Sequence, residues 1–236
     1  MRFFLGLRVG TLIAIAIAAV AVHVAFGDLR GLPQRDSARD TSADIAKTFD
    51  VSGFDSVTVG GVYNVDVNVG GSVFSVSLSG PPEDLARADV SVADGVLVLD
   101  IKDGSKRDGS WKDRRGLTAK VSMPSLKAFE ASGVVDGSVE GVDAEAMSIR
   151  LSGVGDLDVK GKCGALSASL SGVGDLDAEN LECKTASVTV SGAGKASVYA
   201  TEKVAASVGG VGSIVVYGAP KEVSRSSSLF SSITVK

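Results

Sequence analysis

The sequence from Ser132 to Tyr217 repeats one short phrase, which reads SGVVDGSV from Ser132, SGVGDLDV from Ser152, SGVGDLDA from Ser171, SGAGKASV from Ser191 and GGVGSIVV from Gly209. The second residue of every copy is a glycine, and successive glycines lie 20, 19, 20 and 18 residues apart. A fixed period of this length is the signature of a repeat architecture. We therefore interpret the chain as a solenoid in which each copy belongs to one coil.

Strand patterns flank each copy of the phrase. Ile149 and Leu151 alternate with polar residues before the second copy, and Leu157 and Val159 do the same after it. Strict alternation is typical of strands. A single coil cannot bury its apolar side alone, so stacked coils are expected to align these residues as inward columns. The chain is predicted to be all-β, a right-handed parallel β-solenoid (β-helix) with turns of about 18 to 20 residues.

The glycines of the phrase are expected to shape the backbone. Coils bend at fixed positions, and glycine reaches positive φ angles that other residues adopt only at a cost. This interpretation accounts for Gly153 and Gly155, and for their counterparts in later copies, without a ligand. A phosphate-binding loop is disfavoured, because no Gly-Lys-Ser/Thr and no long helix follow the glycines.

The N-terminus carries an export signal. Arg2 and Arg8 precede an apolar run from Val9 to Phe26, and a small residue stands at each of the two positions that an exporting peptidase reads. Residues 1–27 are predicted to form a signal peptide. The run is just long enough for an uncleaved signal anchor helix, which is the alternative. In both cases the repeats are expected outside the cytoplasm, in the periplasm or at the cell surface, with membrane contact only through the N-terminal segment.

Composition divides the remaining chain into three parts. Residues 28–48 are polar and mixed in charge, which predicts a linker. Residues 49–131 are expected to form an N-terminal β part, with a hairpin across Asp94-Gly95, a charged surface loop over residues 102–116, and an early, diverged copy of the phrase, GGVYNVDV, from Gly60. Residues 132–236 are expected to form the repeat β-solenoid, closed by a C-terminal cap.

Charge and histidine content exclude two classes of function. The formal net charge is −4 with both signs mixed along the chain, which gives no electrostatic case for nucleic acid. The single histidine, His23, lies in the export segment, so a Ser/His/Asp triad cannot be assembled in the repeats.

The two cysteines are expected to form a disulfide. Cys163 and Cys183 each stand nine residues before a phrase glycine, so they occupy the same position on adjacent coils. Parallel strands stack about 4.8 Å apart, which is within the Cα separation that a disulfide allows. An oxidising compartment favours the bond, and two small buried thiols are the alternative.

Four aspartates form the sharpest polar cluster. Matched coils place Asp156 beside Asp175 and Asp158 beside Asp177, as two carboxylate rows on the outer face. Stacked like charges repel by about 1 kcal/mol in water, and Lys195, which continues the first row, is positioned to offset this. No cofactor is predicted, and calcium is the candidate ligand that this cluster of carboxylates would suit. Calcium-binding nonapeptide repeats differ, because their period is nine residues.

Paired carboxylates on a β-helix raise a second function class, a polysaccharide-acting enzyme. Glycoside hydrolysis needs an acid and a base at a defined separation, usually above aromatic platforms. The repeats contain only Tyr199 and Tyr217 as aromatic residues. This enzyme is therefore kept as the alternative to a binding module, with no catalytic residue assigned.

The charged loop contains the chain's one tryptophan. Trp111 stands among Arg107, Arg114 and Arg115, interleaved with aspartates. Exposed tryptophan and arginine are residues that anchor protein partners or anionic glycans, so these four are partner-binding candidates. The plainer interpretation is a solvated loop whose tryptophan folds back onto the coils.

The order of these features resembles one protein family. The repeated turns, the leading GGVYNVDV, the segment PPEDLARADVSVADGVLVLDI from Pro81, the junction MPSLKAFEASG from Met123 and the closing VYGAPKEV from Val216 together resemble the bacterial auto-transporter adhesins with a head GIN domain. The resemblance covers residues 49–236. It implies an extracytoplasmic β-solenoid with no established enzyme activity and no catalytic residues.

These observations predict a non-enzymatic, exported β-solenoid of the bacterial envelope that acts as an adhesin-like binding or structural module. The expected partner is an envelope protein or glycan.

Overall fold

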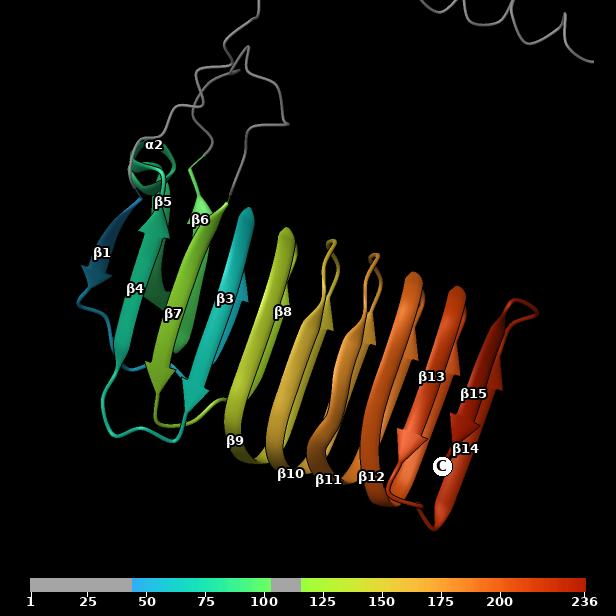
Figure 1. Cartoon of the computed structure of the whole chain (residues 1–236). Helices are drawn as coiled ribbons and strands as arrows, with labels where there is room; N and C mark the ends of the chain where they lie inside the picture. Colours follow the sequence, from blue (N-terminus) through green and yellow to red (C-terminus); the bar gives the residue numbers. More distant parts are fainter. Residues whose placement is uncertain (1–43, 103–115) are drawn as a thin grey trace, which may run out of the picture. The chain divides into compact units, whose positions relative to one another are not determined.

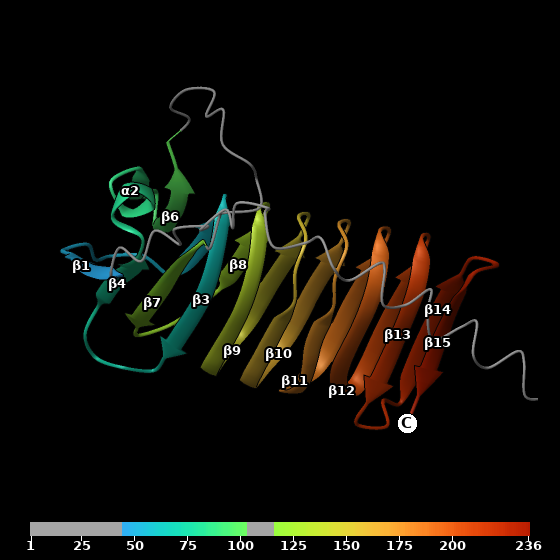
Figure 2. The same cartoon turned by 45° about the horizontal axis from the view of Figure 1, so that its top comes forward.

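The computed structural model describes residues 44–102 and 116–236. Within these residues fifteen strands join one sheet, which winds into parallel stacked coils of a β-solenoid of about five turns, as Figure 1 and, from a second direction, Figure 2 show. The predicted fold class is confirmed. In the described part of the chain no helix has the length and apolar character needed to span a membrane. The export segment and residues 28–43 of the expected linker lie outside the described residues.

Four long strands form the repeat coils: β9 (Val134–Leu151), β10 (Leu157–Leu170), β11 (Leu176–Val190) and β12 (Ala193–Val208). Each bends with its coil and pairs in parallel with the next strand, so that residues one period apart face each other. The inward columns are buried as predicted. They include Ile149, Leu157, Val159, Leu166, Ala168, Leu176, Ala178, Ala186, Val188, Ala196, Val198, Ala206 and Ile214.

The early diverged copy of the phrase is a coil of the same stack. β2 (Ser56–Val59) pairs in parallel with β8 (Ala128–Ala131), and β3 (Val62–Val69) pairs in parallel with β9. The partners Ser56 and Ala128 are 72 residues apart in sequence, although they are neighbours in the sheet. The intervening chain leaves the stack and returns to it.

Part of that intervening chain makes a further coil, which lies out of sequence order. β6 (Val96–Ile101) pairs in parallel with β2, and β7 (Leu117–Met123) pairs in parallel with β3. Both pairings use the side of the β2–β3 coil that faces away from β8 and β9, as Figure 1 shows. Residues 103–115, which connect β6 to β7, lie outside the described residues.

Antiparallel strands finish this end of the stack. β4 (Ser75–Gly80) pairs with β7, and β1 (Ile45–Phe49) pairs with β4. β1 begins inside the segment that was expected to be a linker. Its residues are largely exposed, so backbone pairing with β4, rather than burial of an apolar face, holds this strand in the sheet.

The predicted hairpin also lies here. β5 (Ala88–Ala93) pairs antiparallel with β6, and the turn residues Asp94 and Gly95 have φ values of 52° and 78°. These angles fit the positive φ that a two-residue hairpin turn requires. A short helix, α2 (Pro82–Leu85), precedes β5.

The C-terminal segment forms one more coil. We call the part of each coil before its glycine phrase the first half and the part after it the second half. β13 (Val211–Tyr217) and β15 (Ser231–Val235) extend the second half of the stack, and β14 (Glu222–Ser227) pairs with β12 in the first half. The register sets Arg225 opposite the buried Ala206, and Arg225 itself is exposed. A charged residue on an edge strand discourages further strand addition.

The phrase glycines lie in a column, but their main role differs from the one expected. Gly155 and Gly174 have positive φ (131° and 144°), whereas Gly153, Gly172 and Gly192 do not. A Cβ at any of the last three would overlap a backbone carbonyl of the preceding coil. That carbonyl accepts a hydrogen bond from the next coil; the Val173 N–H donates to the Gly153 oxygen at 3.0 Å. Close backbone approach, more than positive φ, therefore requires these glycines.

Gly172→Ala is expected to lower the free energy of unfolding by about 2–3 kcal/mol, because two coils must separate locally to admit the methyl group. Chemical denaturation of the oxidised protein measures this. Gly209→Ala is the matched control: Gly209 starts the last phrase, and a Cβ there meets no atom within 4 Å. Equal stability of the two variants would contradict the close-approach explanation.

Candidate functional site

The second half of each coil presents a carboxylate-rich outer surface, here called the acidic face. Between the inward positions of β3 and β9–β12, side chains point outward because strand residues alternate in direction. The acidic face comprises eight carboxylates and two lysines: Asp66, Asp136, Glu140, Asp156, Asp158, Asp175, Asp177, Glu179, Lys160 and Lys195.

The first row of the acidic face caps the backbone of the neighbouring coil. Oδ1 of Asp136, Asp156 and Asp175 accepts the backbone N–H of Asp156 at 3.3 Å, Asp175 at 2.8 Å and Lys195 at 2.7 Å, respectively. The structure therefore places Asp156 beside Asp175, with Lys195 next in the row. The partial positive charge of each N–H offsets the repulsion between stacked carboxylates, because a carboxylate is a strong acceptor for backbone N–H groups.

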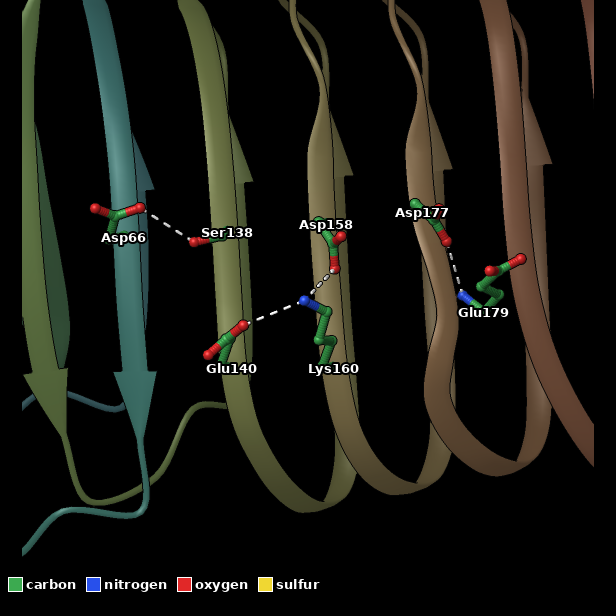
Figure 3. A network of polar contacts seen from close by, with 7 residues as sticks. All are labelled: Asp66, Ser138, Glu140, Asp158, Lys160, Asp177 and Glu179. Atoms are coloured by element: carbon green, nitrogen blue, oxygen red, sulfur yellow. Dashed lines mark hydrogen bonds and ion pairs between the residues drawn. The ribbon is translucent and has the colours of Figure 1, made fainter.

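The second row lies two residues after the first on each strand, and it consists of Asp66, Ser138, Asp158 and Asp177. Figure 3 shows Asp66 accepting a hydrogen bond from the Ser138 hydroxyl at 3.1 Å, and Asp177 accepting one from the Glu179 N–H at 3.2 Å. Asp158 is the register partner of Asp177, so the structure brings these two predicted residues together.

Lys160 links the second row to Glu140. Its Nζ lies 3.2 Å from Glu140 Oε1 and 3.8 Å from Asp158 Oδ1 (Figure 3). The hydrogen bond to Glu140, followed by the charge of Asp158, raises the pKa of Lys160. The lysine therefore stays protonated and neutralises part of this row.

The carboxylates do not converge on a metal position. Among residues 44–102 and 116–236, no group of three or more His, Cys, Asp and Glu side chains is arranged to hold a metal ion. Oδ1 of Asp156, Asp175 and Asp177 is taken up by backbone N–H groups. Calcium binding stays a prediction of the sequence.

Replacing Asp175 tests its capping role. Asp175→Ala leaves the Lys195 N–H without its acceptor and is expected to lower the free energy of unfolding by about 1 kcal/mol. Asp175→Asn keeps an oxygen at the acceptor position and is expected to retain most of that stability. Denaturant titrations of both variants compare them. An equal loss of stability in the two variants would show that the charge of Asp175, rather than the hydrogen bond, stabilises the protein.

A row of exposed apolar residues borders the acidic face, and we call it the valine ladder. Val134, Val154, Val173 and Val211 are 47%, 52%, 56% and 61% exposed, and Ala193 fills the remaining rung. Each rung pairs with the next, so the ladder crosses five coils. The sequence analysis did not predict this row, although Val154, Val173 and Val211 each stand between two glycines; Val134 has a glycine before it and Val135 after it.

The first half of the coils presents a different surface. Ala146, Ala165 and Thr185 line a groove of about 550 Å³ with the serine column of Ser148, Ser167 and Ser187. Lys127 and Lys203 stand at its ends and pair with Asp55 and Glu222 at 2.5 and 3.2 Å. The hydrogen bond from Lys127 lowers the pKa of Asp55. This face therefore has small side chains and no unpaired lysine at its ends.

Cys163 and Cys183 form a disulfide between adjacent coils. They are register partners in β10 and β11, their Cα atoms are 4.5 Å apart, and both are buried. The structure thus brings together the cysteines that the repeat spacing aligned. The bond fixes one coil to the next on the side of the coil away from the glycine column.

Reduction of this disulfide is expected to lower stability. The bond closes a loop of about 20 residues, and chain-entropy arguments assign such a loop about 3 kcal/mol. Thermal unfolding with and without reductant measures the effect. The Cys163→Ala/Cys183→Ala variant is the control, because reductant should leave its melting temperature unchanged. If reductant fails to shift the wild-type protein, the disulfide is not closed in solution.

The other predicted site lies outside the described residues. Trp111, Arg107, Arg114 and Arg115 belong to the unassigned stretch 103–115. The described residues on either side of that stretch pack against the turn that precedes β3. A Cβ at Gly116 would meet Val62, and a Cβ at Gly61 would meet the Ile101 side chain.

Comparison with known proteins places the chain in a family. Residues 53–220 match the family described as "Putative auto-transporter adhesin, head GIN domain". The chain belongs to this family. The resemblance inferred from the order of the sequence features is thereby confirmed, and the family description indicates an exported or surface protein that binds surface molecules. The search of curated proteins found no match to this chain.

Solved structures share its fold. A "putative adhesin" from Bacteroides fragilis is 24% identical with a TM-score of 0.68, covering 83% of this chain and 98% of its own. "Putative adhesin" structures from Parabacteroides merdae and Parabacteroides distasonis are 14% and 18% identical, both with a TM-score of 0.52; they cover 83% and 82% of this chain, and 97% of their own length. At these identities the likeness concerns the fold.

Proposed function

We propose that this protein is a non-enzymatic, exported binding module of the bacterial envelope or cell surface, with adhesin-like function. One observation carries the proposal: the outer surface repeats similar side chains on successive coils, so that the valine ladder crosses five coils and the aspartate rows of the acidic face cross the coils that contain β9, β10 and β11. Extended repetitive surfaces suit recognition of large partners better than catalysis on a small substrate. Membership of an adhesin family supports the same conclusion.

The alternative is a polysaccharide-acting enzyme, for which the adjacent positions of Asp158 and Asp177 are the specific observation. The hydrogen-bonding pattern favours the binding module. Asp158 lies beside an ion-paired lysine, and Asp177 accepts a backbone N–H, so each carboxylate has a local structural partner.

Binding to immobilised envelope extract tests the proposed function. The full exported protein is expected to bind native extract saturably, with parallel extracts treated with protease or periodate to remove protein or glycan sites. The same samples are assayed for release of reducing sugars. No saturable binding, or sugar release that disappears when Asp156, Asp158, Asp175 and Asp177 become alanine, would overturn the proposal in favour of the enzyme.

The charged loop is examined with the same binding assay. Trp111→Ala is expected to weaken binding at an unchanged melting temperature, because tryptophan is a frequent anchor at interfaces. Normal binding by this variant would exclude the loop and direct attention to the solenoid surface. The Val73→Ala variant, at a 68% exposed position away from the ladder, is the control.

A further inference from the structure

We propose that the valine ladder, with Leu229 and Phe230 at its end, binds a basic, amphipathic polypeptide segment of another protein. This inference rests on the proposed function and names the partner class for one surface. Two observations support it: a continuous exposed apolar row, and an acidic face beside the Val134, Val154 and Val173 rungs of that row.

The apolar row extends beyond the repeats. Leu229 is 96% exposed and Phe230 is 79% exposed, in the turn between β14 and β15. Phe230 directly precedes Ser231, the register partner of Gly212, so it takes the next rung after Val211. In Figure 1 the turns that carry the valines and the turn between β14 and β15 follow the same edge of the solenoid. The ladder therefore ends in an aromatic and an aliphatic side chain, which are residues able to anchor a partner in an apolar contact.

Exposure at this edge follows from the backbone. Phrase glycines stand on both sides of Val154, Val173 and Val211, so no adjacent side chain on the same coil covers these three valines. Val134 has a glycine on one side only and is followed by the buried Val135. The close approach of the coils allows only glycine at these positions, so the backbone beside the valines carries no side chain. The valine ladder is therefore a ridge of methyl groups between two strips of backbone, accessible to a partner along its length.

Charge selects the partner. Asp136, Asp156 and Asp175 follow the valines by two residues on their coils, and each uses Oδ1 for a backbone N–H. The other oxygen of each carboxylate is available to a cation in solution, because these residues are exposed. The acidic face as a whole has eight carboxylates and two lysines, whereas the chain has 28 acidic and 24 basic residues, so negative charge is concentrated here. Lysine or arginine beside apolar side chains complements this surface.

The same charge disfavours two other occupants. A second copy of the chain would bring another acidic face close, and like charges across an interface are repulsive. An anionic membrane surface would be repelled for the same reason. A basic segment places its apolar side chains on the ladder and its charges on Asp136, Asp156 and Asp175.

A peptide-binding experiment tests the inference with the full, oxidised protein. The probe is a fluorescent 12-residue peptide of alternating valine and lysine, and the comparison peptide alternates valine and glutamate. Fluorescence anisotropy should show binding of the basic peptide that weakens about tenfold or more between 0.05 and 0.5 M salt, as expected for contacts between exposed charges. The acidic peptide should not bind.

Two sets of variants separate the charge from the apolar contact. Asp136→Asn/Asp156→Asn/Asp175→Asn keeps the backbone acceptors, removes the charges, and should weaken the basic peptide about tenfold with a smaller salt dependence. Val154→Ser/Val173→Ser and Phe230→Ser should each weaken it at unchanged salt dependence. Val73→Ser and Glu202→Gln, at exposed positions outside the ladder and the acidic face, are matched controls and should bind as the wild type does.

Each opposing result overturns the inference. Equal binding of the basic peptide to all variants, or no binding at all, removes the ladder as its site. Sedimentation that shows a dimer abolished by Val154→Ser/Val173→Ser assigns the ladder to a second copy, and binding to phosphatidylcholine vesicles through Phe230 assigns it to lipid. Saturable, protease-resistant binding to envelope extract without peptide binding would sink this inference while leaving the proposed function intact.

Discussion

The backbones of successive coils touch at the glycine column, and the rest of the structure depends on that contact. At Gly153, Gly172 and Gly192 the backbone of one coil lies so close to the next that only a hydrogen atom fits in place of a side chain. The carbonyl of each glycine accepts an N–H from the following coil, as in the 3.0 Å bond from Ala193 to Gly172. These bonds set the spacing between successive coils, and they hold the register of the strands before and after each glycine turn.

A fixed register turns each outward residue into a row. Asp156 and Asp175 are one position on two coils, and the same is true of Val154 and Val173. A side chain that recurs at the same position of successive repeats therefore forms a continuous row on the surface of the stack. The acidic face, the valine ladder and the serine-lined groove all arise in this way. An extended, repetitive surface is a natural basis for adhesion, because many weak contacts in series add to a specific interaction.

The two ends of the described stack are finished differently. At the β1 end, antiparallel strands and α2 follow the last parallel coil, and β1 and β5 are short. At the β15 end, the final coil is parallel, but the exposed Arg225 stands opposite the buried Ala206, and Ser228, Leu229 and Ser231 take the positions of Gly209, Gly210 and Gly212. Both arrangements limit the addition of further strands, which is the general hazard of an open sheet.

Periodicity determined the coils themselves. From spacing alone the sequence defined which residues face inward, the adjacency of Cys163 and Cys183, and the rows of Asp156 with Asp175 and Asp158 with Asp177, because residues one period apart are neighbours in any stack of equal coils. The tertiary structure alone decided the position of the β6–β7 coil and the strand at Ile45–Phe49. The physical reason is that pairing between unrepeated segments depends on backbone hydrogen bonds, which every sequence can offer and no side-chain pattern specifies. Likewise, the need for glycine at Gly172 comes from a carbonyl of another coil, whose closeness exists only after the chain is wound.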